Sequence, residues 1–226
     1  MSHKILEDLL KSNGASLVGF CKLDASPIKN QPHLIYAVSI AVKLSDSVLR
    51  TIDKRPTIMY FQHYRTANAR LDQLAFDCVK DIEDCGFDAF PIAGSQSMPE
   101  NKYYGVFQHK TAARLAGLGY VGKNSMFITP EYGSKIRLAT VLTDMPLEST
   151  RSIISTDCGD CTICQNACPV GCIYGDNFSP ENPTAELFDK EKCSNHMKTY
   201  NDVGRGAVCG LCFRACPKNK LDSPVK

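Results

Sequence analysis

The chain has 226 residues, a formal net charge of +2 and twelve cysteines. This length suits one medium domain with a small one, and there is no run of eighteen apolar residues to span a membrane. No block of Lys and Arg is present to contact phosphates. The amphipathic N-terminus lacks the apolar core and cleavage site of a secretory signal. We therefore expect a cytoplasmic protein that binds neither a membrane nor nucleic acid.

The first part of the chain alternates between patterns typical of helices and of strands. Residues 5–14 predict a short amphipathic helix that ends at a glycine, and 16–23 and 34–44 are apolar runs that suit buried strands. Apolar residues at helical spacing predict a long helix over 56–86. The elements expected after it are a strand over 87–92, a polar loop over 93–105, a helix over 109–119, and strands over 125–129 and 135–147.

This alternation favours an α+β fold in which helices cover a central sheet. Nine of the twelve cysteines lie after residue 157, which marks the last third of the chain as a separate module. We expect two domains, 1–150 and 151–226, joined by a linker over 145–157.

Two cysteine runs carry the strongest chemical signal in the sequence. Residues 158–169 read C-x2-C-x2-C-x3-C-P, and residues 209–217 read C-x2-C-x3-C-P. In the bacterial ferredoxin pattern three closely spaced thiolates bind one 4Fe–4S cluster, and the fourth binds the other cluster. Zinc ribbons use two C-x2-C pairs instead. The runs therefore predict two 4Fe–4S clusters, for which they supply seven of the eight thiolates.

The eighth ligand must come from Cys172 or Cys193. Cys172 is one helical turn beyond Cys168, so its side chain would stack behind Cys168. Cys193 arrives from a separate segment, which favours it, and Cys172 stays the alternative. We expect one cluster to be held by Cys158, Cys161, Cys164 and Cys216, and the other by Cys168, Cys193, Cys209 and Cys212.

A stretch over 112–124 has more glycines than the end of a helix needs. It contains Gly117, Gly119 and Gly122, followed by Lys123 and Asn124. The spacing matches neither a P-loop nor the dinucleotide-binding fingerprint. Two interpretations stay open, a helix C-cap followed by turns, or a loop whose backbone approaches a bulky ligand while Lys123 offers a cation.

The sequences TAARLAGLGYVGKN, PEYGSKIRLATVLTD and CGDCTICQNACP, in this order, resemble the epoxyqueuosine reductase family. These are corrinoid-dependent iron–sulfur enzymes related to reductive dehalogenases, and the resemblance runs from about residue 60 to residue 217. The family also places an isolated cysteine before its last cluster run, as Cys193 is placed here.

The resemblance implies a corrinoid-binding domain of nitroreductase-like fold, followed by a small ferredoxin-like domain with the two clusters. Electrons would pass through the clusters to a bound cobalamin or other corrinoid. The residues implied for the corrinoid site are Gly117, Gly119, Gly122, Lys123 and Asn124.

Two departures from the family shape the expected function. Gln62 stands where the family has an acidic proton donor, so His63 or Tyr64 becomes the nearest candidate, with Tyr104 and His109 as weaker ones. The chain also stops ten residues after Cys216, where tRNA-modifying members continue into a helical-repeat domain.

We therefore expect a reductase acting on a small molecule, not on tRNA, with reduced ferredoxin or flavodoxin as electron donor. The alternative is a non-catalytic protein that transfers electrons, or that binds and reduces a corrinoid for a partner.

Overall fold

The computed structural model describes residues 2–96, 98, 103–155, 158–183, 185–204 and 208–221. The chain separates into two compact units, each built from stretches that are distant in sequence. Unit one comprises Met1–Lys43, Thr66–Gly119 and Ile136–Ile154, and unit two comprises Leu44–Arg65, Tyr120–Lys135 and Ser155–Lys226.

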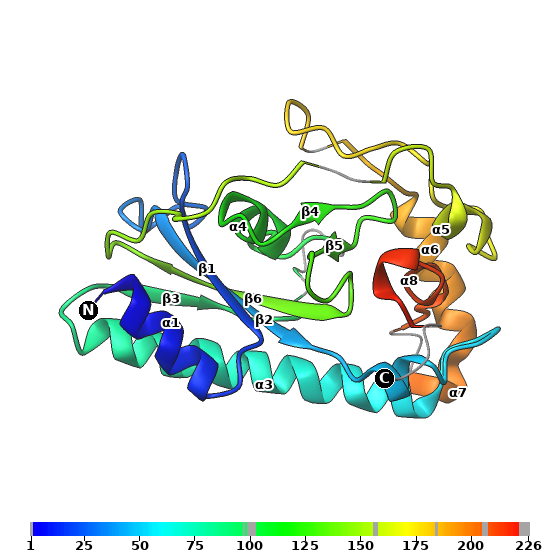
Figure 1. Cartoon of the computed structure of the whole chain (residues 1–226), viewed down its shortest axis with the longest axis horizontal. Coiled ribbons are helices and arrows are strands. Elements are labelled where there is room, and N and C mark those ends of the chain that lie inside the picture. The colour runs from blue at the N-terminus through cyan, green and yellow to red at the C-terminus, as the bar shows by residue number, and fades with distance from the viewer. Residues whose placement is uncertain are drawn as a thin grey trace. The chain divides into compact units, whose positions relative to one another are not determined.

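Unit one is organised around a four-stranded antiparallel sheet with the order β1-β2-β6-β3 (Figure 1). Its strands are β1 (Leu17–Lys22), β2 (Tyr36–Lys43), β3 (Ala89–Ile92) and β6 (Ile136–Thr143). β2 and β6 are buried along nearly their whole length, as their continuous apolar sequences predict. Both faces of the sheet must therefore be covered.

Helices cover the two faces. Side chains of α1 (His3–Ser12) and α3 (Ile58–Glu83) form one core with alternate residues of β1, such as Val18 and Phe20. Gly19 points to the opposite face, where a Cβ atom would meet Ala116 at 2.9 Å, just after α4 (His109–Leu115). The sheet thus lies between α1 and α3 on one side and α4 on the other.

Unit two contains short elements joined by turns. These are α2 (Asp46–Leu49), β4 (Tyr120–Val121), β5 (Phe127–Ile128), α5 (Ile163–Asn166), α6 (Lys190–Met197), η1 (Lys198–Tyr200), α7 (Asn201–Gly204), α8 (Leu211–Arg214) and η2 (Pro217–Asn219).

The mixed α/β character and the long elements expected from the sequence are confirmed. The bounds of the units differ from a division at residue 150, because residues 44–65 and 120–135 lie in the unit that contains the cysteine runs. The assignment of 1–150 and 151–226 to two separate functions stays a prediction.

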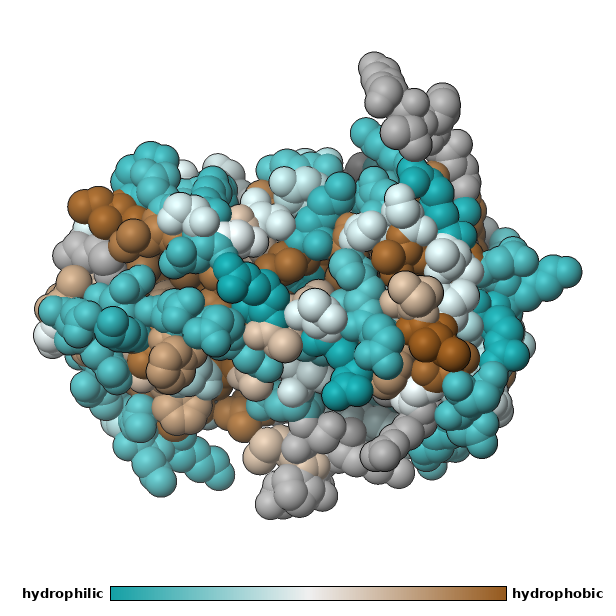
Figure 2. Space-filling model, turned by 90° about the horizontal axis from the view of Figure 1, so that it is seen from below, coloured by the Kyte–Doolittle hydropathy of each residue, from teal (hydrophilic) through white to brown (hydrophobic). Residues whose placement is uncertain are grey.

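In the described part of the chain, no helix is both long and apolar enough to cross a bilayer. Exposed apolar side chains on α3 include Ile58, Met59 and Phe76. Figure 2 shows hydrophobic areas scattered among hydrophilic ones on one face of the molecule. Scattered apolar residues of this kind are normal on a protein surface.

His109 begins α4 and is held by two hydrogen bonds inside unit one. Its Nε2 lies 2.9 Å from the carbonyl oxygen of Ala93, and its Nδ1 lies 2.9 Å from the hydroxyl of Thr140. A carbonyl can only accept, so the proton sits on Nε2, and Nδ1 accepts from Thr140. Burial, with a smaller contribution from Arg137, lowers the pKa of His109 to about 4. A neutral ring with both nitrogens occupied is poorly suited to donate a proton to a substrate.

We expect His109 to make stability depend on pH in acid. Its pKa is about 6.5 in the unfolded chain and about 4 in the folded one. The stabilisation is complete above pH ~6.5 and is lost as the pH falls toward 4, because the unfolded state then binds a proton that the folded state does not. The loss amounts to at most about 3 kcal/mol.

Two measurements check this expectation. An NMR titration should show the His109 ring still neutral at pH 5. In urea unfolding, His109→Gln should lose less stability than wild type between pH 7 and 5. Parallel curves for the two proteins would show that the pKa of His109 is not lowered in the folded state.

Candidate functional site

The first cysteine run folds as a tight loop followed by one helical turn. The N–H of Cys161 donates to the carbonyl of Cys158 at 3.0 Å, and α5 carries Cys164. Gly159 has a φ of +48° between the first two cysteines, a conformation that glycine adopts without strain. These turns leave the cysteine side chains half-buried, so several thiols come close together without being sealed in a core.

Cys216 from the second run joins the first three thiols. Burial raises the pKa of the Cys216 thiol, and the thiolates of Cys158, Cys164 and Cys161 raise it further. An effect of neighbouring charges on a pKa requires that they lie within a few ångströms. The structure therefore brings together the four residues that we expect to hold the first cluster.

Cys193 is positioned by a short antiparallel pairing. The N–H of Asp189 donates to the carbonyl of Cys172 at 2.8 Å, and Tyr174 donates to Leu187 at 3.1 Å. Asp189 then caps α6, where its carboxylate accepts from the N–H of Lys192 at 2.8 Å. The segment after Cys168 is thereby tied to the start of the helix that carries Cys193.

The second group forms around Cys212. Burial raises the pKa of the Cys212 thiol to about 12, and the thiolates of Cys209, Cys193 and Cys168 add to the rise, with Cys164 of the first group contributing least. Burial also raises the pKa of Cys168. The main-chain N–H groups of residues 170–172 and the Cys172 thiol lower it by more, so its pKa lies below the ordinary value. The four residues expected to hold the second cluster thus lie in one neighbourhood.

The donor set suits clusters better than single ions. Zinc holds each sulfur at about 2.3 Å, but among the described residues no group of three or more His, Cys, Asp or Glu could hold one metal ion. Each thiol group is close enough for mutual repulsion and too widely spaced for one ion. Four thiolates around a larger cavity are the donor set of a 4Fe–4S cluster.

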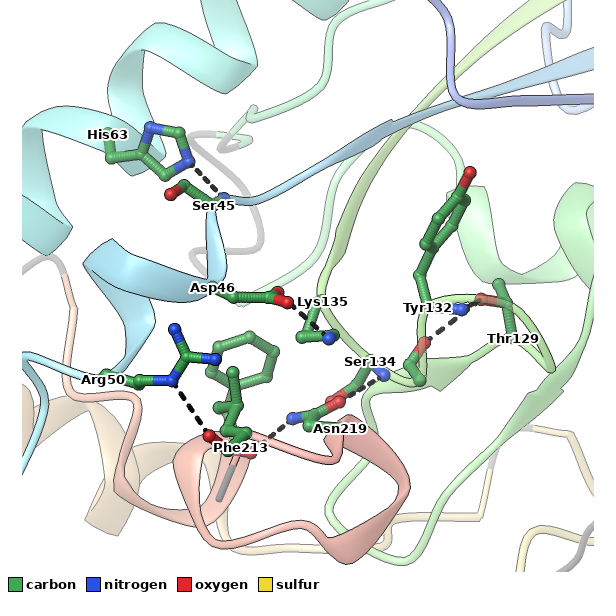
Figure 3. A network of polar contacts seen from close by, with 12 residues as sticks. Ser45, Asp46, Arg50, His63, Thr129, Tyr132, Ser134, Lys135, Phe213 and Asn219 are labelled. Carbon is green, nitrogen blue, oxygen red and sulfur yellow. Dashed lines mark hydrogen bonds and ion pairs between the residues drawn. The ribbon is translucent and has the colours of Figure 1, made fainter. Parts of the chain in front are cut away.

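A buried polar network fixes the second cysteine run within unit two (Figure 3). Asn219 is fully buried, and its Oδ1 accepts from the N–H of Ser134 at 2.7 Å and from the Ser134 hydroxyl at 3.1 Å. Its Nδ2 donates to the carbonyl of Phe213 at 2.7 Å. Nearby, Arg50 donates to the carbonyl of Leu221 at 2.9 Å, and Lys135 pairs with Asp46 at 3.0 Å. The loop that carries Cys209, Cys212 and Cys216 is thus bonded to residues far away in sequence.

We expect Asn219→Ala to destabilise unit two by about 2–4 kcal/mol, because it leaves two donors and a carbonyl of a buried site without partners. The exposed Asn30 gives a matched control, since Asn30→Ala removes the same amide from the surface. Urea unfolding of both variants measures the difference. Equal stability in the two variants would show that the network contributes nothing.

The glycine-rich stretch divides between the two units. Gly117 ends the turn after α4 with a φ of +68°, and a Cβ atom there would lie 2.6 Å from Cβ of Arg151. This close packing explains why residue 117 is a glycine, without any need for a ligand. Gly119 is the last residue of its stretch of unit one, and Gly122, Lys123 and Asn124 lie in unit two.

Gly122 and Asn124 face the cysteine segments. A Cβ atom at Gly122 would meet the side chain of Ile128 at 2.6 Å and Sγ of Cys158 at 3.5 Å. Asn124 donates from Nδ2 to the carbonyl of Cys212 at 3.4 Å. The turn between β4 and β5 therefore supports both thiol groups, which the sequence pattern alone does not reveal.

Lys123 is 7 % exposed, and among the described residues the structure gives its ammonium no hydrogen bond or ion pair. The stem of Lys123 is buried, while its ammonium keeps contact with solvent. Lys123 therefore offers a charge for an anionic or strongly polar group that the polypeptide does not supply.

The two proton-donor candidates lie near the start of α3, beside Gln62. Nε2 of His63 accepts from the main-chain N–H of Ser45 at 2.8 Å (Figure 3), so the ring carries its proton on Nδ1. Burial lowers the pKa of His63, which favours the neutral ring at pH 7. The Tyr64 ring packs edge-on against Tyr60 at a centroid distance of 6.5 Å. The proton-donor roles of His63 and Tyr64 stay predictions.

Sequence comparison finds epoxyqueuosine reductases. The chain is 31% identical over 117 residues to the epoxyqueuosine reductase of Staphylococcus aureus, and 34% identical over 133 residues to that of Synechocystis. These matches cover 51% and 55% of this chain, but only 30% and 46% of the two relatives. No family model matches the chain.

Solved structures share the fold. An epoxyqueuosine reductase solved with an epoxyqueuosine-modified tRNA-Tyr stem loop has a TM-score of 0.62 at 23% identity, covering 96% of this chain and 65% of that one. A reductive dehalogenase whose structure suggests a mechanism for B12-dependent dehalogenation has a TM-score of 0.70 at 22% identity, covering 93% of this chain and 31% of that one.

These findings overturn two expectations from the sequence. A small-molecule reductase that does not act on tRNA, or a non-catalytic electron carrier, is contradicted by relatives that are epoxyqueuosine reductases. The expected absence of a nucleic-acid partner is contradicted by the tRNA-bound structure of the same fold. The expectation that tRNA is not the substrate rested on the point where the chain stops, and the non-catalytic alternative rested on that point and on Gln62. Neither feature describes the surface that receives a substrate.

The expected resemblance is confirmed: the chain is similar in sequence to epoxyqueuosine reductases over about half of its length, and it shares the fold of these enzymes and of reductive dehalogenases.

Proposed function

We propose that this chain catalyses the reduction of epoxyqueuosine in tRNA. The sequence similarity to epoxyqueuosine reductases carries the proposal. Reducing an epoxide consumes two electrons and two protons. The chain must therefore hold a source of strongly reducing electrons beside the nucleoside, and we place this reaction in the cytoplasm, where thiols stay reduced.

The two thiol groups support the electron source. In this proposal Cys158, Cys161, Cys164 and Cys216 hold one 4Fe–4S cluster, and Cys168, Cys193, Cys209 and Cys212 hold the other. The clusters supply single electrons, and a corrinoid supplies a strongly reducing cobalt centre. Because the thiols come from segments that interlock within unit two, the two clusters would be held at a fixed separation.

The remaining residues of the site would bind the corrinoid, position the cysteine loops and supply protons. We assign the sheet-based unit a nitroreductase-like fold. Lys123, which lies in unit two, is the residue that we propose to pair with a polar or anionic group of the corrinoid. Among the described residues its ammonium has no hydrogen bond or ion pair, which leaves it available for this role. Gly122 and Asn124 position the cysteine loops, and His63 and Tyr64 are the proposed sources of the two protons.

The test uses protein reconstituted anaerobically with iron, sulfide and cobalamin. tRNA carrying epoxyqueuosine is incubated with this protein and a low-potential reductant, then digested, and its nucleosides are measured by mass spectrometry. We expect loss of epoxyqueuosine in proportion to the protein added. A second protein, the variant Lys123→Met, keeps most of the side-chain volume but removes the charge, and it tests the role of Lys123.

Lys123→Met should weaken cobalamin binding, measured by its change in absorption, while iron content stays unchanged. If wild-type protein that holds both clusters and cobalamin leaves epoxyqueuosine intact, the proposed reaction is wrong. If Lys123→Met binds cobalamin as wild type does, the role of Lys123 is wrong and the reaction can still stand.

A further inference from the structure

A ninth thiol lies inside the second thiol group. Sγ of Cys172 is 3.4 Å from Sγ of Cys168. Cys193 lies close enough to Cys172 for the two thiols to interact. Cys172 is only 2 % exposed, so these contacts form in the interior of unit two. The thiol is not a surface cysteine that passes near the group by chance.

The backbone holds Cys172 in this place. Its N–H donates to Sγ of Cys168 at 3.4 Å, and its carbonyl accepts from Asp189 at 2.8 Å. The next residue, Ile173, forms a β-bridge with Phe188. Cys172 therefore sits at the junction between the loop that carries Cys168 and the segment that leads to Cys193.

We propose that Cys172 is a reserve ligand of the second cluster, able to replace Cys168 or Cys193 as the fourth thiolate. This inference rests on the cluster binding in the proposed function. A change of χ1 rotamer moves a cysteine sulfur by about 3 Å, which is close to the separation of Cys172 and Cys168. The exchange needs no oxidant, because one thiolate leaves the iron, taking up a proton, while another binds and releases one.

The proposal is selective among the four ligands. Cys172 contacts Cys168 and lies close enough to Cys193 for their thiols to interact, so it can take over at those two corners of the cluster. Cys209 and Cys212 come from the second run, on α8 and just before it. Their replacement would require Cys172 to leave its pairing with Asp189. The cluster should therefore tolerate the loss of Cys168 or Cys193 and not that of Cys209 or Cys212.

The experiment measures iron and sulfide in full-length protein reconstituted anaerobically, with circular dichroism to confirm that each variant is folded. Wild type and Cys172→Ala should each hold about eight irons. Cys168→Ala and Cys193→Ala should hold nearly the same amount, whereas Cys209→Ala and Cys212→Ala should fall about two-fold. Adding Cys172→Ala to Cys168→Ala or Cys193→Ala should produce the same two-fold fall, and adding Cys85→Ala, the exposed control thiol, should not.

A second readout is the EPR spectrum of the reduced protein, which should change in Cys193→Ala even though its iron is retained, because one thiolate then has a different geometry. A two-fold fall in all four ligand variants would overturn this inference and leave the proposed function intact. If Cys168→Ala or Cys193→Ala keeps its iron after Cys172→Ala is added, the inference is overturned as well. Wild-type protein that assembles no cluster would overturn both.

Discussion

Gly133→Ala is expected to cost unit two about 2–5 kcal/mol and to strip iron from both clusters. Gly133 has a φ of +60°, where a residue with a Cβ atom is strained by about 1–2 kcal/mol. The added Cβ would also overlap the main-chain oxygen of Lys218 and lie 2.5 Å from Oδ1 of Asn219. Backbone cannot move aside as a flexible side chain can, so a further cost of about 1–3 kcal/mol for overpacking follows.

The effect on iron follows from the loop that would be displaced. Residues 209–219 carry Cys209 and Cys212 of one thiol group and Cys216 of the other. Pushing this segment away from Gly133 therefore disturbs both groups at once. Iron content after reconstitution and urea unfolding measure the two effects.

Gly86→Ala is the matched control for Gly133→Ala. Gly86 also has a positive φ, +83°, but a Cβ atom there meets nothing within 4 Å. This variant bears the backbone strain without the collision, so we expect a loss of about 1–2 kcal/mol and full iron content. If the two variants behave alike, the collision at Gly133 has no influence on the cysteine loop.

The secondary structure could be read from the sequence because its signals are local. The apolar runs of β2 and β6 and the helical spacing in α3 are visible within windows of ten to twenty residues. What the sequence does not show is that residues 44–65 and 120–135 share a compact unit with the cysteine runs. That arrangement depends on contacts such as Asn219 with Ser134, which are 85 residues apart. A single buried amide leaves no periodic trace in a sequence.

The candidate site shows the same contrast. Thiolate spacing is set by the size of a cluster, so seven of the eight ligands and their type follow from the cysteine runs. The support of these loops by Gly122 and Asn124 does not follow, since nothing in the glycine-rich pattern says which ligand or loop its backbone approaches. The substrate was predicted wrongly because recognition depends on a whole surface, of which one sequence shows only single residues.

The crossed ligand assignment makes a prediction that single substitutions cannot test. If Cys216 joins Cys158, Cys161 and Cys164, then Cys158→Ala and Cys216→Ala remove the same cluster, and each should lose about half of roughly eight irons. The double variant Cys158→Ala/Cys216→Ala should lose no more than either single one. Cys158→Ala/Cys212→Ala should lose nearly all iron, because it damages both clusters. All these variants keep Cys168 and Cys193, the two thiols that Cys172 contacts.

The uncrossed arrangement gives the opposite pattern, which makes the comparison decisive. If Cys216 bound the same cluster as Cys209 and Cys212, its neighbours in sequence, the pair Cys212→Ala/Cys216→Ala would lose only half of the iron and Cys158→Ala/Cys216→Ala would lose all of it. The position of Cys216 among the thiols of the first run, which raise its pKa, leads us to expect the crossed pattern. Iron and sulfide analysis of the reconstituted double variants distinguishes the two arrangements. Where one cluster survives, its EPR spectrum should match that of the corresponding single variant.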